Sequence, residues 1–131
     1  MLRSIVCATA LVVAFNAAAQ AQETYTAFEI AEQGLELDAA GLTATFRGKT
    51  ITVTGTFNRF IDTGYGDMVY VAFDHPDTIS WEVSCGFPRD NTAEYDRFAL
   101  MKPGTEISAT GDFLEAKDIY RYFTLLPCQM H

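Results

Sequence analysis

The sequence has few residues of the kinds that perform chemistry. Its 131 residues include only two histidines, three cysteines and one tryptophan. No group of His and Cys has the spacing of a metal site, no serine stands in a G-x-S-x-G turn, and no glycine-rich phosphate loop occurs. We therefore predict no catalytic residue, no metal and no cofactor, and we interpret the chain as a non-enzymatic protein.

Basic side chains are also scarce. The chain has 9 Lys and Arg against 17 Asp and Glu, and the basic residues are scattered rather than gathered in a run. Without Arg3 the formal net charge is 8 − 17 = −9. Because non-specific nucleic-acid affinity is almost wholly electrostatic, this charge argues against a nucleic-acid partner, and it disfavours docking on an anionic membrane surface.

Long hydrophobic runs are absent except near the start. Arg3 precedes an apolar run over residues 5–15, which is too short to cross a bilayer. Ala19 and Ala21 supply the small residues that a signal peptidase reads, so we predict a signal peptide over 1–21, a single domain over 22–131 and a periplasmic or secreted protein. The alternative is a buried N-terminal helix. The residues before Cys7 loosely resemble a lipobox. A lipidated cysteine follows the apolar region of its signal peptide, whereas Cys7 lies near the start of that region, which argues against lipidation there.

Two cysteines, Cys85 and Cys128, remain after residue 21. Exported domains with an even cysteine count usually pair them, so we expect a disulfide. The bridge would close a loop of 44 residues (128 − 85 + 1). In the chain-entropy model such a loop contributes about 4 kcal/mol. Two buried free thiols are the alternative.

Residues 49–60 have the strongest strand pattern in the chain. Threonines alternate with Ile51, Val53, Gly55 and Phe57, as in a half-buried strand, and the glycine suggests a bulge or bend. Further strands are expected over 68–73, 79–85, 105–113 and 119–126. In 79–85 we expect the side chains of the odd-numbered residues, Ile79 to Cys85, to face the core. Residues 114–118 should form a polar hairpin loop.

Helices are expected before the first strand and between the third and fourth. A helix over 25–33 should end at Gly34, and Asp38 should cap a second over 39–46. Asn91 should cap the helix that precedes the turn at 102–104. The order β-β-β-α-β-β after an N-terminal helix predicts a mainly β, five-stranded Greek-key barrel, the OB-fold.

Four segments resemble a known family. Residues 46–55, FRGKTITVTG, are similar to the opening "Y-x-G-K-x-V-x-V-x-G" of the tRNA_anti-like family of small bacterial OB-fold proteins. Residues 83–87 (VSCGF), 100–111 (LMKPGTEISATG) and 125–128 (LLPC) resemble its later motifs, so the likeness covers about 38–128. The resemblance implies the fold, and the family name implies single-stranded nucleic-acid binding. The matching residues are structural, and none carries a catalytic role.

OB-folds bind ligands on the face of strands two and three, between the loops that join strands one and two and strands four and five. Here those loops are 62–67 and 115–118. Tyr65 and Tyr70 could form a stacking platform, with Arg59 and Arg121 as hydrogen-bond donors. Such a set suits a protein or a glycan. The alternative is that Tyr70 belongs to the core and Tyr65 to an ordinary turn.

A carboxylate site is the remaining alternative. Asp62, Asp67 and Glu82 with Arg59 could serve a small hydrolase, although solvated surface charge explains the same residues. We therefore expect an exported OB-fold binding module for an unidentified protein or glycan.

Overall fold

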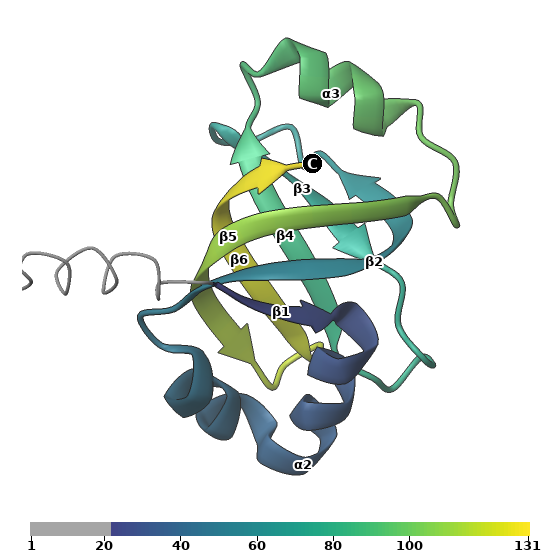
Figure 1. The fold of residues 1–131 in the computed structure, drawn as a ribbon. Coiled ribbons are helices and arrows are strands. Elements are labelled where there is room, and N and C mark those ends of the chain that lie inside the picture. The colour runs from purple at the N-terminus through teal and green to yellow at the C-terminus, as the bar shows by residue number, and fades with distance from the viewer. Residues whose placement is uncertain (1–21) are drawn as a thin grey trace, which may run out of the picture.

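The computed structural model describes residues 22–131, and the predicted signal peptide lies outside them. The described chain forms a mainly β barrel with a helix at each end (Figure 1). Its elements are β1 (Glu23–Thr26), α2 (Ala27–Phe46), β2 (Thr50–Ile61), β3 (Met68–Phe73), β4 (Glu82–Pro88), α3 (Thr92–Ala99), β5 (Glu106–Lys117) and β6 (Tyr122–Met130).

The barrel has the strand order of the predicted OB-fold. The order β2-β3-β4-β6-β5 closes through the pairing of β5 with β2. The pair β4–β6 is parallel, and the other four pairs of the barrel are antiparallel. Closure through β2 is possible because this strand is long: residues 50–56 pair with β5, and residues 57–61 pair with β3. The five-stranded barrel is therefore confirmed.

Strand β1 was not predicted. It runs parallel to β2, with Glu23 opposite Ile51 and Thr26 opposite Thr54, on the edge of β2 that β3 leaves unpaired. Tyr25, which we placed in a helix, lies in this strand, and its ring packs edge-on against Phe46 with centroids 5.3 Å apart. The prediction of a helix from residue 25 was wrong because this pairing partner lies 28 residues away along the chain.

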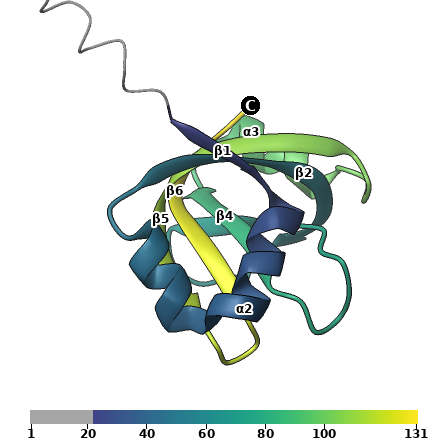
Figure 2. The ribbon, with the colours of Figure 1, turned by 60° about the horizontal axis from the view of Figure 1, so that its bottom comes forward.

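The N-terminal helix α2 begins later than expected and does not end at Gly34. Thr26 caps it through a capping box with Glu29. Helix and barrel approach closely at Gly34, where an added Cβ would lie 2.3 Å from Cδ1 of Trp81. Packing against Trp81 therefore explains this glycine, rather than helix termination. The helix runs across one end of the barrel (Figure 2).

The predicted helix boundary at Asp38 is confirmed as a kink within α2. Asp38 has φ 57°, and its Oδ1 accepts a hydrogen bond from the backbone N–H of Gly41, as an N-cap does. Asn91 likewise caps α3, accepting from the N–H of Glu94. Phe98 of α3 is fully buried and covers the other end of the barrel.

The core contains the apolar face of β2 as predicted. Ile51, Val53 and Phe57 are buried, and Gly55 lies where an added Cβ would come within 3.1 Å of Phe73. The register irregularity in β2 falls between Phe57 and Arg59, not at the glycine. Gly55 therefore provides room for a neighbouring ring, and the bulge follows it.

Of the residues expected to face the core around the third strand, Trp81, Val83 and Cys85 are buried, but Ile79 is 64% exposed. The prediction for Ile79 was wrong because β4 begins only at Glu82. Residues 79 and 80 belong to a turn in which Asp77 Oδ1 accepts hydrogen bonds from Ile79 N and Ser80 Oγ. Those local bonds turn the chain before the strand starts.

The last hairpin differs from the prediction in its boundaries. Strand β5 continues to Lys117, and β6 begins at Tyr122, so the loop is 118–121 instead of 114–118. Residues 113–117 stay extended because they pair with β6, Phe113 opposite Leu125 and Lys117 opposite Tyr122. Polar composition alone therefore misplaced the turn, and Ile119 is 71% exposed rather than in a strand.

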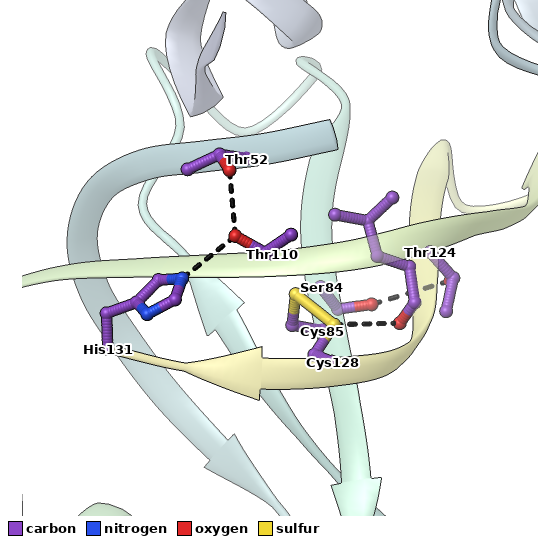
Figure 3. Close-up of a disulfide and its surroundings, with 8 residues drawn as sticks. Thr52, Ser84, Cys85, Thr110, Thr124, Cys128 and His131 are labelled. Atoms are coloured by element: carbon purple, nitrogen blue, oxygen red, sulfur yellow. Dashed lines mark hydrogen bonds between the residues drawn. A yellow bond between two sulfur atoms is a disulfide. The ribbon is translucent and has the colours of Figure 1, made fainter. Parts of the chain in front are cut away.

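The predicted disulfide is confirmed. Cys85 of β4 and Cys128 of β6 are bonded, with Cα atoms 5.8 Å apart. The bond joins two adjacent parallel strands (Figure 3). Gly111 of β5 lies opposite Cys128, and an added Cβ there would come within 2.6 Å of the Cys128 sulfur. The glycine thus leaves space for the bridge.

Candidate ligand-binding face

The outer surface of β3 and β4 is the candidate site. Val69 and Val71 of β3 point into the core, so Tyr70 and Ala72 face outward. Cross-strand pairing sets Tyr70 opposite Gly86 and Ala72 opposite Ser84. Residues of β2, β4 and β6 lie on the same side as these two. We call the whole set the β3–β4 face: Arg59, Tyr70, Ala72, Glu82, Ser84, Gly86 and Thr124.

The centre of the β3–β4 face is made of small side chains. Ala72, Ser84 and Thr124 are buried although they lie on its outer side. Tyr70 lies across Gly86, where an added Cβ would be 2.7 Å from Tyr70 Cε1. Tyr70 is therefore half-buried by packing against its own sheet, and its ring forms part of the surface rather than projecting from it.

Arg59 is held on the β3–β4 face by an acidic partner. Its Nη2 lies 2.6 Å from Glu82 Oε1, and His75 Nε2 lies 3.8 Å from Glu82 Oε2. The Arg59 side chain is still 53% exposed. It can donate to a ligand, but its charge is offset by Glu82.

The loop 62–67 stands at one end of the face and carries Tyr65, which is 83% exposed. The loop is held by Arg89, whose Nη1 lies 2.6 Å from Asp62 Oδ1. Arg89 Nε donates to Gly66 O, and its Nη2 donates to Tyr65 O. Bonds from Arg89, which lies between β4 and α3, therefore fix the loop backbone from which the exposed ring projects.

Asp62 is the acceptor at the centre of this network. The Arg89 guanidinium, then the Tyr95 hydroxyl and the Gly64 backbone N–H, lower the pKa of Asp62 to about 2. The hydrogen bond that each donates to Asp62 raises the pKa of Tyr95 and the pKa of Arg89. The sequence reasoning missed Arg89 and Tyr95, since they lie 27 and 33 residues beyond Asp62.

The turn 118–121 stands at the other end. Arg121 Nη1 donates to Ile79 O, and Glu82 N donates to Arg121 O. Tyr120, which we had placed in a strand, is 88% exposed. Asp118 Oδ1 accepts from Ala39 N at 3.0 Å, which ties the turn to α2. A hollow of 340 Å³ opens between this turn and the loop before β4.

The two loops flank the face rather than meet. Met68 pairs with Pro88 beside the 62–67 loop, while Glu82 pairs with Tyr122 beside the 118–121 turn. Six strand steps separate those ends, or about 20 Å. The structure therefore brings Arg59 and Tyr70 together on one surface and places Tyr65 and Arg121 at its two opposite ends.

The carboxylates of the hydrolase alternative do not gather. Asp62 is bonded to Arg89 at one end of β4, whereas Glu82 is paired with Arg59 at the other. Within residues 22–131, no group of three or more His, Cys, Asp and Glu side chains is placed to hold a metal ion.

A second open hollow, of 670 Å³, lies on the opposite side of the barrel. It runs from Phe28 of α2 across the hydroxyl-bearing outer surface of β2 and β5 to His131. His131 Nε2 lies 2.8 Å from Thr110 Oγ1, which in turn lies 2.7 Å from Thr52 Oγ1 (Figure 3). On this side of the barrel, the side chains of Thr52, Thr110 and His131 are therefore hydrogen-bonded to one another.

No family model matches the chain, and no curated protein matches it. Among solved structures, it is similar to a candidate nucleic acid-binding lipoprotein from Klebsiella pneumoniae, with a TM-score of 0.62 and 18% identity over 88% of this chain and 96% of that one. A candidate aspartyl-tRNA synthetase from Leishmania major matches with a TM-score of 0.48 and 8% identity, covering 85% of this chain and 21% of that one. The first likeness supports the fold. None of the described helices is both long and apolar enough to cross a membrane.

Proposed function

We propose that this protein is an exported, non-enzymatic binding module, and that its ligand, a protein segment or a glycan, lies along the β3–β4 face. The observation that carries this proposal is the placement of two strongly exposed tyrosines, Tyr65 and Tyr120, at opposite ends of one face. Exposed aromatic rings on rigidly held loops are typical contact residues, because they cover a large area and lose little side-chain entropy on binding.

Export is supported by three independent features. The first 21 residues have the pattern of a signal peptide, the chain forms a disulfide, and the structure with a TM-score of 0.62 is that of a lipoprotein. The motif resemblance to the tRNA_anti-like family of small bacterial OB-fold proteins agrees with this proposal. A place outside the cytoplasm would expose the face to envelope proteins and glycans.

The shape of the face favours an extended ligand. Its floor of small side chains leaves room along the strands, and Arg59 and Tyr70 offer a donor and a ring between the two ends. Both loops are fixed by hydrogen bonds, so little ordering would be needed on binding. A ligand that contacts both tyrosines must extend over about 20 Å.

Single-stranded nucleic acid is the second candidate. It is favoured by the similarity to a structure described as nucleic acid-binding, and by aromatic side chains that could stack on bases. The net charge of −9 after residue 21 opposes it (8 − 17). So does the pairing of Arg59 and Arg89 with carboxylates on and beside the face.

The test is an NMR titration of the ¹⁵N-labelled protein. The protein is expressed with its own first 21 residues and purified in the form that remains after processing in the cell. The probes are neutral hexasaccharides, a pool of random decapeptides and a 15-residue oligothymidine at low salt. We expect a saccharide or peptide probe to shift amides of β3, β4 and both flanking loops.

Tyr65→Ala should weaken that binding, and Leu100→Ala is the matched control, since Leu100 is equally exposed at 83% but lies after α3. Shifts confined to other surfaces would contradict the proposal. Binding of oligothymidine alone, lost with added salt, would favour the second candidate.

A further inference from the structure

We propose that the hollow at the 118–121 turn is a binding site for a neutral saccharide, with Tyr120 as the ring against which a sugar stacks. This inference rests on the proposed binding function of the β3–β4 face and names the ligand class at one end of it. The hollow, which we call the tip hollow, has a volume of 340 Å³ and is lined by Thr78, Ile79, Ser80, Asp118, Tyr120 and Arg121.

The backbone of the turn points to a contact role. Tyr120 has φ 64° and Arg121 has φ 49°, a region that glycine adopts readily and side-chain-bearing residues do not. At its other positive φ positions the described chain uses glycine, four times, except at the helix cap Asp38. Tyr120 is 88% exposed, so packing does not offset the unfavourable backbone. A short hairpin turn requires such φ values, and glycine would meet them at lower cost, so the two large side chains are kept here against a local preference, as at many functional sites.

The chemistry of the tip hollow suits a polyhydroxylated ligand. Thr78 and Ser80 supply hydroxyls, Asp118 supplies a carboxylate and Arg121 a guanidinium. These four groups can donate to and accept from sugar hydroxyls, while Tyr120 offers an apolar ring for the C–H face of a sugar.

Charge distinguishes the ligand classes. Asp118 and Arg121 contribute opposite charges to the lining, so the tip hollow favours a neutral ligand over a phosphate or another anion. Four of its six lining residues are polar, which favours a saccharide over an apolar peptide side chain.

The polar groups are held in place before a ligand arrives. Arg121 Nη1 donates to Ile79 O, and Asp118 Oδ1 accepts from Ala39 N at 3.0 Å. Ser80 Oγ donates to Asp77 Oδ1 at 3.0 Å, which fixes this largely buried hydroxyl at the edge of the hollow. Among residues 22–131, no side-chain partner of Asp118 Oδ2 or Arg121 Nη2 is found, so both remain available.

The experiment is calorimetry of the processed protein with neutral disaccharides (cellobiose, chitobiose and maltose) and their hexamers. Disaccharides should bind weakly, and Tyr120→Gly should reduce their affinity at least tenfold. Ile119→Gly is the matched control: Ile119 lies in the same turn, is 71% exposed and does not line the hollow, so its effect should stay within twofold. Tyr65→Ala should also stay within twofold for disaccharides, because Tyr65 lies at the far end of the face.

If no neutral saccharide binds at millimolar concentration, or if Tyr120→Gly binds as tightly as the parent, the inference is overturned. If peptide or oligothymidine shifts amides of the β3–β4 face and no saccharide does, the inference fails while the proposed binding function stands. If no probe shifts those amides, both fail. Saccharide binding mapped to the Phe28–His131 hollow would move the site to the other side of the barrel and overturn the inference.

Discussion

The two loops at the ends of the β3–β4 face solve the same backbone problem in different ways. The 62–67 loop places Gly64 and Gly66 at its positive φ positions and is bonded to Arg89. The 118–121 turn places Tyr120 and Arg121 at such positions instead. The first arrangement favours stability, and the second keeps two large side chains at the surface. Under the proposed function, the 118–121 turn is where we expect stability and ligand contact to compete.

The largest expected effect lies in the barrel that carries both loops. Cys128→Ser should lower the free energy of unfolding by about 2–5 kcal/mol, because the Cys85–Cys128 bond closes a long loop (sequence separation 43). The Cys85→Ser/Cys128→Ser double variant should cost about as much as either single variant. Denaturant unfolding measures this, and hydrogen exchange should show both end loops loosened alike. A double variant that costs the sum of the two singles would contradict a shared bond.

A smaller loss should follow a change in the 62–67 loop. Gly66→Ala puts a side chain at φ 74°, where nothing lies within 4 Å of an added Cβ. The cost is therefore that of the backbone alone, about 1 kcal/mol. Gly104→Ala, at φ 92° and also in open space, is the matched control and should cost a similar amount. An unchanged denaturation midpoint in Gly66→Ala would show that the loop adjusts freely.

The pH dependence of the 62–67 loop follows from Asp62. Its folded pKa, about 2, is lower than its usual value. The bonds from Arg89 and Tyr95 to the carboxylate thus stabilise the fold above about pH 4, and this stabilisation is lost as the pH falls towards 2. Asp62→Asn should melt at a lower temperature than the parent at pH 7, and the gap should shrink in acid. A gap that is constant from pH 7 to pH 2 would rule out this role.

The sequence was sufficient for the fold and insufficient for the site. Alternation in β2, the caps Asp38 and Asn91, and the pairing of Cys85 with Cys128 are local or few-choice signals, and the structure confirms them. Strand β1 depends on a partner 28 residues away, which local patterns do not encode. The end of β5 is set by hairpin pairing with β6, Lys117 opposite Tyr122, and this pairing outweighs the polar composition of residues 114–118.

The candidate site shows the same division. Arg59 shares the face of Tyr70 because the bulge between Phe57 and Arg59 shifts the alternation of β2, which would otherwise turn Arg59 to the buried side. The support of Tyr65 by Arg89 depends on contacts over 24 residues, and Tyr120 was assigned to a strand because Ile119–Tyr120 resembles the start of one by composition. Side chains on turns are placed by where strand pairing stops, so an error in the end of β5 became an error in the site.

The most direct test of the account measures stability and saccharide affinity on the same Tyr120→Gly protein. Relief of the positive φ, less the entropy that glycine loses on folding, should raise the free energy of unfolding by about 0.5–1 kcal/mol. Ile119→Gly, at a neighbouring residue without a positive φ, should not gain stability. We expect a Tyr120→Gly protein that is more stable and binds more weakly; one that is less stable, or that binds as the parent does, would contradict the role given to Tyr120.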